Sequence, residues 1–337
     1  MKKLLATTAL VGLVASSASF AETKVSGSIE ATYNSISEGS TSAAGSGGLG
    51  NEVNLKISNT TELDNGLTAN GHINFEDKGS STAYDSQEIG LSSGNFKVYV
   101  GTDTGQHMNS NINPKVDDAG FDSMSGEIGN DGMNRYATHD VNHIGVEAKT
   151  DFGTVAVMYS PSDAGASASS GSTASADGSS MEFNFKGSLG VEGLTVLAGK
   201  QTIEAYDSAS TTAGQLEEEE TYIGFSYKYG QFAVGAGKRT HDDGDSASAT
   251  NSVDNSTSYS VTYAVNDQIS LGYEITNAEK ELVNASNPEE ETKAMTIGYD
   301  LGGLGLSFMW TETDNLASSN AAADDKEAFQ IRTVYKF

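Results

Sequence analysis

The stretch 90–94, GLSSG, has the spacing of a hydrolase nucleophile motif, in which a serine lies between two glycines. That motif requires a strand, a sharp turn and then a helix, so that the turn exposes the serine hydroxyl. Here Phe96, Val98 and Val100 follow at every second position, which indicates a second strand instead. The sequence therefore predicts a hairpin turn at this stretch, and we expect no catalytic residue and no enzymatic activity.

The residues that could bind a metal ion form no strong pattern. The five histidines show no zinc spacing, and the chain has no cysteine. Asp242, Asp243 and Asp245 could bind Ca²⁺ in a loop, although an EF-hand would need glycine where Ala247 or Ser248 stands. A weak loop-bound Ca²⁺ and a solvated acidic loop both stay open, and no other cofactor is expected. The run 217–220, EEEE, is interpreted as a second acidic loop.

The N-terminus has the layout of a secretory signal. Lys2 and Lys3 precede an apolar run over 4–15, and Ser19-Phe20-Ala21 forms a small-x-small cleavage site. We expect residues 1–21 to be removed, and loss of the two lysines would change the formal charge from −27 to −29. Such acidity argues against a nucleic-acid partner. No later apolar run reaches eighteen residues, so no membrane-spanning helix is expected.

The elements that must position the polar residues are strands, because apolar side chains recur at every second position. The last stretch, 327–337, is typical, with Phe329, Ile331, Tyr335 and Phe337 on one face. Seven short turns alternate with eight longer loops between the predicted strands. The sixteen strands are expected at about 23–33, 51–63, 67–75, 84–91, 96–100, 144–148, 155–159, 181–185, 194–206, 223–229, 232–236, 259–265, 269–275, 295–301, 306–310 and 327–337.

An even number of antiparallel strands, with short turns at one end and long loops at the other, is the pattern of a transmembrane β-barrel. A lipid environment requires such a sheet to close, because no water is present to satisfy unpaired backbone groups. Aromatic residues fall near both strand ends, as expected for two lipid interfaces. These are Tyr33, Tyr159, Tyr206 and Phe329 near the loops, and Phe96, Tyr229, Phe232, Tyr299 and Phe337 near the turns. The competing fold is a secreted β-solenoid or multi-sandwich adhesin.

Three stretches resemble the general porins of Gram-negative outer membranes, most closely those of α-proteobacteria such as Rhodobacter. They are the strand-turn-strand segment 88–105, the stretch Asn134-Arg135-Tyr136 and the terminal Phe337. The resemblance implies an all-β, sixteen-stranded barrel over 22–337 with short periplasmic turns and long external loops. It also implies that the third loop, 104–136, folds into the lumen as a constriction, that barrels form homotrimers, and that the barrel-assembly machinery recognises Tyr335 and Phe337.

The residues expected at the constriction are mostly acidic. Porins of this family set an acidic third loop against basic residues on the facing wall, and here the basic set is sparse. The acidic candidates are Asp117, Asp118, Asp122, Glu127 and Asp131. The basic candidates are Lys24, Lys56, His72, Arg135 and Arg332. Because carboxylates concentrate cations in a narrow lumen, we expect a weak cation selectivity.

The function expected from these features is an outer-membrane porin that passes small hydrophilic solutes and ions by passive diffusion. Its other expected partners are outer-membrane lipids and lipopolysaccharide, whose phosphates could share divalent cations with the acidic run 217–220. Two alternatives stay open: a solute-specific channel of the same fold, and a non-conducting structural or adhesive surface protein.

Overall fold

The computed structural model of the chain describes residues 21–38, 47–77, 82–102, 142–161, 179–206, 215–242, 252–282, 289–314 and 326–337. Within these ranges there is no helix that is long and apolar enough to cross a membrane. The chain forms sixteen strands. They are β1 Ala21–Glu38, β2 Gly47–Glu62, β3 Thr68–Asp77, β4 Thr82–Ser93, β5 Phe96–Thr102, β6 Asn142–Thr150, β7 Gly153–Ser160, β8 Ser180–Gly187, β9 Leu194–Tyr206, β10 Gln215–Tyr229, β11 Phe232–Asp242, β12 Ser252–Ala264, β13 Ile269–Leu282, β14 Glu289–Asp300, β15 Leu304–Asp314 and β16 Lys326–Lys336.

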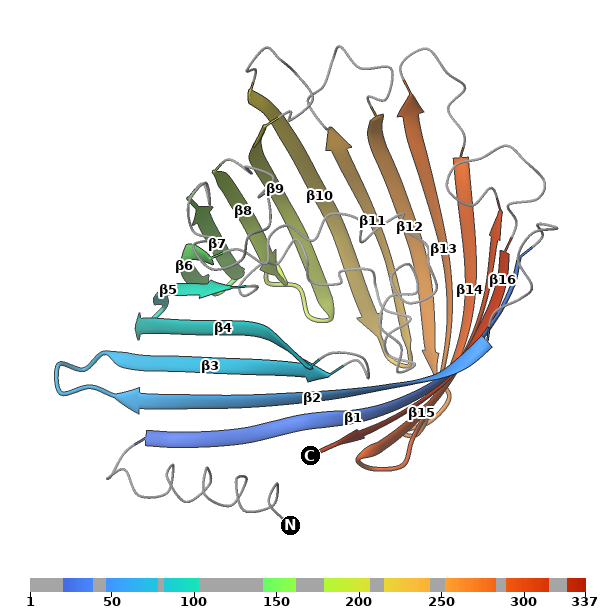
Figure 1. Ribbon diagram of the computed structural model, residues 1–337, viewed down its shortest axis with the longest axis horizontal. Coiled ribbons are helices and arrows are strands. Elements are labelled where there is room, and N and C mark those ends of the chain that lie inside the picture. The colour runs from blue at the N-terminus through green and yellow to red at the C-terminus, as the bar shows by residue number, and fades with distance from the viewer. Residues whose placement is uncertain are drawn as a thin grey trace.

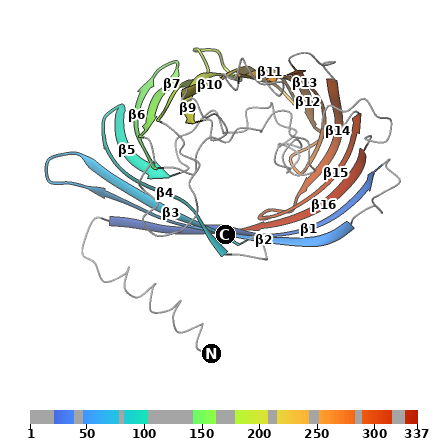
Figure 2. The same cartoon turned by 45° about the horizontal axis from the view of Figure 1, so that its top comes forward.

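The strands form one closed antiparallel barrel, in which each strand pairs with its neighbours in sequence and β16 pairs with β1. Figure 1 shows the strands side by side in chain order, and Figure 2 shows them as a ring. Closure leaves no strand edge exposed to lipid. The predicted sixteen-stranded barrel is therefore confirmed.

The seam of the barrel is formed by the last residue of the chain as well as by β16. The β1–β16 ladder runs from Ser28 opposite Lys336 to Glu38 opposite Lys326. Beyond it, the amides of Gly27 and Phe337 each donate to the other residue's carbonyl oxygen at 3.0 Å. A Cβ atom at Gly27 would lie 2.8 Å from Cζ of Phe337, so the missing side chain leaves room for the terminal ring.

The two faces of the sheet have opposite polarity, as the alternation in the sequence requires. On β14, Met295, Ile297 and Tyr299 are exposed on the outside, whereas Thr292 and Thr296 are buried on the inside. The same alternation runs through the other strands, with large apolar side chains exposed and polar ones buried. The barrel is therefore apolar where it meets lipid and polar where it encloses the lumen.

Seven of the connections between strands are short and lie at the same end of the barrel as the C-terminus. They span 63–67, 94–95, 151–152, 188–193, 230–231, 265–268 and 301–303. The turn expected between the strands 51–63 and 67–75 is confirmed: Gly66 has φ 79°, which favours glycine, and the Leu63 amide donates to the Leu67 carbonyl at 2.7 Å. The predicted loop 104–136 and residues 1–20 of the predicted signal lie outside the described residues.

The aromatic residues predicted near the turns all lie on the outer face. Phe96, Tyr229, Phe232, Tyr299 and Phe337 are each exposed. Near the loops, Tyr33 and Tyr159 are exposed, and the Tyr33 ring contacts Phe329 with centroids 5.7 Å apart. The side chain of Tyr206 lies outside the described residues.

Two segments expected to lie between strands are strand, the first entirely and the second in part. Residues 217–220 lie within β10, where Glu219 is paired with Lys200 of β9 by an ion pair of 2.7 Å, so the loop prediction is wrong. Between the expected strands 232–236 and 259–265, residues 237–242 belong to β11 and residues 252–258 to β12. These strands continue beyond the part of the barrel whose outer face is apolar. Their backbone hydrogen bonds therefore extend past the residues in which apolar and polar side chains alternate.

Candidate pore lining

The predicted basic residues that the structure describes all belong to the inner face near the seam. Lys56 lies opposite Ser26, His72 opposite Ser58, and Arg332 opposite Thr32; Ser26 and Thr32 lie on the same face of β1 as the buried Glu30. Lys24 has the same parity as Glu30 on β1 and is 68% exposed. Arg135 and the five acidic candidates, Asp117, Asp118, Asp122, Glu127 and Asp131, lie outside the described residues, so their roles stay predictions.

Two of the basic candidates are already bound to carboxylates. Arg332 Nη2 donates to Glu30 Oε2 at 2.5 Å across the seam, and both side chains are largely buried. Lys24 Nζ lies 3.3 Å from Glu22 Oε1. A cation that is paired in this way contributes less net field to the lumen than a lone one. The basic side of the lumen is therefore weaker than its count of residues suggests.

A buried cluster on β3–β6 surrounds Tyr99. Glu88 accepts hydrogen bonds from Lys97 Nζ at 2.7 Å and from Asn70 Nδ2 at 2.9 Å. Lys97 also lies over the Tyr99 ring, 4.5 Å from its centroid, and the His143 ring packs edge-on at 5.8 Å. Tyr99 is 1% exposed because Gly90 and Gly145 on the adjacent strands leave room for it.

A second buried cluster lies across β10–β13. Arg239 forms an ion pair with Glu220, and both side chains are buried. Tyr222 lies opposite Arg239, and its hydroxyl reaches over the positions of Gly224 and Gly237. Further along the wall, the Thr276 hydroxyl donates to Glu274 Oε1 at 3.2 Å.

These two clusters were missed in the sequence, although the strand parity contained the signal. Phe96, Val98 and Val100 point outward, so Lys97 and Tyr99 between them must point inward. Tyr222 alternates in the same way with Ile223 on β10. What the sequence could not supply is the partner of each residue across strands, because that depends on the register of pairing.

Between these charged groups lies a continuous field of hydroxyl side chains on β12–β15. The register brings them side by side; for example, Thr292 and Thr313 lie opposite each other with their oxygens 2.9 Å apart. A concave wall makes inward side chains converge, so short ones are buried between longer ones. The buried members are Ser256, Ser258, Ser260, Thr262, Thr276, Thr292, Thr296, Ser307, Thr311 and Thr313.

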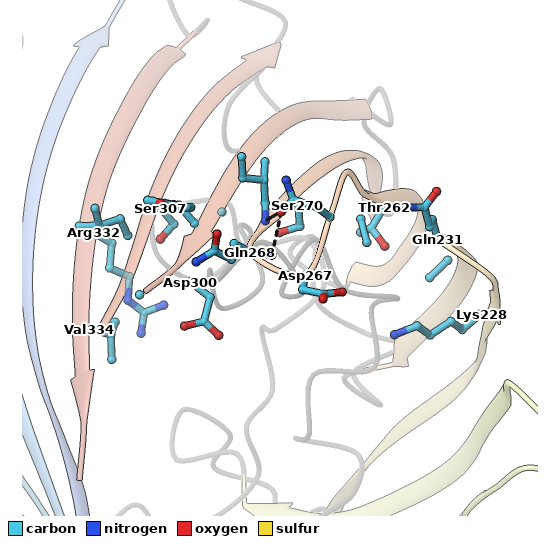
Figure 3. A pocket seen from close by; sticks show the side chains of 18 of the residues that line it. Lys228, Gln231, Thr262, Asp267, Gln268, Ser270, Asp300, Ser307, Arg332 and Val334 are labelled. Carbon is cyan, nitrogen blue, oxygen red and sulfur yellow. Dashed lines mark hydrogen bonds between the residues drawn. The ribbon is translucent and has the colours of Figure 1, made fainter. Parts of the chain in front are cut away.

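At the turn end, the inner faces of β10–β16 surround a hollow of about 830 Å³. Figure 3 shows Asp300 and Asp267 between Arg332 on one side and Lys228 on the other. The Asp300 carboxylate accepts a hydrogen bond from the Gly302 amide at 2.7 Å, which fixes the nearby turn. Charges of both signs, with Gln231, Gln268 and Ser270 beside them, make this mouth hydrophilic without giving it a single sign.

Only one of the three aspartates predicted to bind Ca²⁺ lies among the described residues. Asp242 ends β11, whereas Asp243 and Asp245 lie outside the described residues. Among the residues that the structure does describe, no group of three or more His, Cys, Asp and Glu residues could hold a metal ion.

Comparison with known proteins is consistent with this geometry. The family model described as Gram-negative porin matches residues 6–316. No curated protein matches the chain. Among solved structures, OmpT of Vibrio cholerae is similar at a TM-score of 0.71 and 13% identity, covering 96% of this chain and 99% of OmpT. An anion-selective porin from Comamonas acidovorans is similar at a TM-score of 0.69 and 14% identity, covering 94% of this chain and 100% of that porin. A mutant Rh. blastica porin is similar at a TM-score of 0.59 and 13% identity, covering 94% of this chain and 100% of that porin. At such identities these structures establish the fold alone.

Proposed function

Because the chain belongs to the Gram-negative porin family, whose place is the outer membrane, we propose that it is a passive diffusion channel for small hydrophilic solutes and ions. The observation that carries the proposal is the closed barrel with an apolar outer face and an inner wall of charged and hydroxyl side chains. Such a wall suits water and polar solutes. No step of bond making is assigned to any residue, and the GLSSG stretch lies at a hairpin between β4 and β5.

The test is a planar-bilayer recording of the purified chain. Steady open steps that scale with salt support a general diffusion channel. Block by one solute that saturates indicates a solute-specific channel, and silence from a correctly folded barrel indicates a structural or adhesive protein. A series of neutral solutes of rising size, added to the same recording, measures the width of the passage.

The selectivity that we propose is weakly cationic. Two observations support it: the high acidity of the chain, and the pairing of Arg332 with Glu30, which reduces the basic field. A wide aqueous pore is screened within about 8–10 Å at physiological salt, so the preference should fade as salt rises. Neutralising Asp117, Asp118, Asp122 and Glu127 together should move the reversal potential in a salt gradient toward zero. An anion-selective wild type would contradict this proposal.

Assembly into a homotrimer and recognition through Tyr335 and Phe337 are parts of the same proposal. A trimer form is named for OmpT of Vibrio cholerae. Within this chain, Phe337 bonds to Gly27 and stacks on Tyr335 at 6.4 Å between ring centroids. Deleting Phe337 should abolish the heat-modifiable trimer on gels, whereas Lys336→Ala, on the inner side of the same strand end, should leave it intact.

The remaining predictions have direct tests. Mass spectrometry of the secreted chain should find Glu22 at its start if residues 1–21 are a signal. Thermal unfolding with and without a chelator tests the loop-bound Ca²⁺ and divalent bridging to lipopolysaccharide. Closer kinship with α-proteobacterial porins stays a prediction, since the Rh. blastica structure gives a lower TM-score than the Vibrio cholerae one.

A further inference from the structure

Glu274 is a buried carboxylate on the inner wall for which the described part of the chain supplies little compensation. It is 3% exposed, and its single hydrogen bond comes from the Thr276 hydroxyl to Oε1. Its other oxygen, Oε2, has no hydrogen-bond partner among the described residues. Arg239, on β11, forms an ion pair with Glu220. An ionised carboxylate in this position is costly unless a positive group approaches it.

Several further hydroxyl-bearing residues belong to the same part of the inner wall as Glu274. Ser260 is directly opposite it on β12, and Ser258 is opposite Thr276. The Tyr222 hydroxyl lies 2.6 Å from where a Cβ atom of Gly237 would be, and Ser258 Oγ lies 3.5 Å from that same point. Tyr222 is 7% exposed, and its hydroxyl has no hydrogen-bond partner among the described residues. The Glu274 cluster therefore comprises Tyr222, Ser258, Ser260, Glu274 and Thr276.

The composition of the Glu274 cluster selects the charge of its ligand. One carboxylate and four hydroxyl groups provide oxygen donors with a single negative charge. Calcium sites use six to eight oxygen ligands, generally with several carboxylates, so a divalent ion would remain under-compensated here. A single positive charge matches the single carboxylate, whether it is an alkali-metal ion or a protonated primary amine.

We propose that the Glu274 cluster binds one monovalent cation, either an alkali-metal ion or the ammonium group of a passing solute. The proposal rests on the proposed channel function and gives its cation preference a place on the barrel wall, separate from the loop 104–136. The inner-face neighbours of Glu274 on β13 and β14 include Gly272 and Ala294, so these positions place no large side chain beside the carboxylate.

Bilayer recordings of three variants test the proposal. Glu274→Gln removes the charge with little change in shape, and Tyr222→Phe removes one oxygen without changing the charge. Glu182→Gln is the matched control: Glu182 is also 3% exposed on the inner wall and accepts a hydrogen bond on Oε1, from Asn184 at 2.7 Å, but unlike Glu274 it has no buried oxygen that lacks a hydrogen-bond partner among the described residues. We expect wild-type conductance to saturate at low KCl, and Glu274→Gln to lose that saturation and lower the cation-to-anion permeability ratio about twofold.

The two other variants separate binding from a general field effect. Tyr222→Phe should raise the half-saturating KCl concentration severalfold, and Glu182→Gln should leave it unchanged. Equal effects of Glu274→Gln and Glu182→Gln would overturn the proposal, as would wild-type behaviour of Tyr222→Phe. Methylammonium chloride in place of KCl shows whether an ammonium group binds as well; saturation in either salt supports the site, and saturation in neither overturns it.

A second measurement does not depend on conduction. The melting temperature of the folded barrel is compared in KCl and in choline chloride of equal ionic strength, because choline is too bulky to enter the cluster. Stabilisation by K⁺ in the wild type and not in Glu274→Gln supports the site even if the recordings are silent, in which case only the proposed function fails. Equal melting temperatures of the wild type in the two salts would overturn the site while leaving open steps, and hence the channel, unaffected.

Discussion

Buried carboxylates have different partners on two walls of the lumen. On the seam wall, formed by β16 and β1–β5, the buried Glu30 is paired with Arg332, and the buried Glu88 with Lys97. On the hydroxyl wall, formed by β10–β15, Arg239 pairs with Glu220, and Glu274 has, among the described residues, only the hydrogen bond from the Thr276 hydroxyl. Both walls have the same strand geometry, and each has an inward tyrosine, Tyr99 or Tyr222, that packs over glycines. What differs is that Glu30 and Glu88 each have a cation, whereas Glu274 has none among the described residues.

That difference suggests how one barrel can combine rigidity with a charge preference. A paired carboxylate holds neighbouring strands together, and its field is largely cancelled. A carboxylate among hydroxyl groups contributes less to structure, and its field is available to a mobile cation. Ion permeation should therefore depend on the hydroxyl wall, while the stability of closure should depend on the seam wall.

The largest effect is expected at the seam. Arg332→Met leaves the Glu30 carboxylate buried without its cation, which should lower the free energy of unfolding by about 3–5 kcal/mol. Denaturant unfolding of the barrel measures it. Adding Glu30→Gln to Arg332→Met removes the isolated charge and should restore most of the loss. If the single variant is as stable as the wild type, the seam pair is not structural and the contrast between the walls fails.

The second prediction tests whether the hydroxyl wall faces the lumen. Leu271 is 40% exposed on the outer face of β13, and its neighbour Ser270 lies on the inner face. Leu271→Lys should lower the stability of the barrel in lipid by about 2–4 kcal/mol, as for a lysine near the bilayer midplane. Ser270→Lys should fold normally. The reverse outcome would place the whole strand in the opposite orientation, because a shift of one residue exchanges the two faces.

The third prediction compares how tightly Tyr99 and Tyr222 pack against the glycines beside them. An added methyl group at Gly145 would collide with the Tyr99 ring, and one at Gly237 would lie 2.6 Å from the Tyr222 hydroxyl. Each Gly→Ala variant should be destabilised by about 1–3 kcal/mol, the range for overpacked sites. Tyr222→Phe should rescue Gly237→Ala, since the hydroxyl is the closest atom. Tyr99→Phe should not rescue Gly145→Ala, because ring carbons also collide there. Equal rescue in both melts would contradict this geometry.

Much of this contrast could not be predicted from the sequence. The alternation of Met295, Ile297 and Tyr299 with the smaller Thr296 and Gly298 is an example of the pattern that predicted the strands, their faces and the turns, because a transmembrane strand repeats every two residues. The same alternation predicted strands that were too short near Glu219 and His241, because the outer face becomes polar there while strand pairing continues. The partners of Arg332, Lys97 and Arg239 lie on other strands, so only the register reveals them.

The smallest effect is expected when a carboxylate of the seam wall loses its cation and so comes to resemble Glu274 on the hydroxyl wall. Lys97→Met also leaves a buried carboxylate without its cation, but the Lys97 side chain is 22% exposed against 12% for Arg332, so the loss of stability should be smaller than in Arg332→Met. The variant leaves Glu88 with only its hydrogen bond from Asn70, which resembles the state of Glu274. The reversal potential in a KCl gradient should then shift toward stronger cation preference. Lys24→Met is the control, because Lys24 and Glu22 are exposed and solvent screens them. An unchanged potential in Lys97→Met would mean that the pairing of a wall carboxylate does not govern the field that ions encounter.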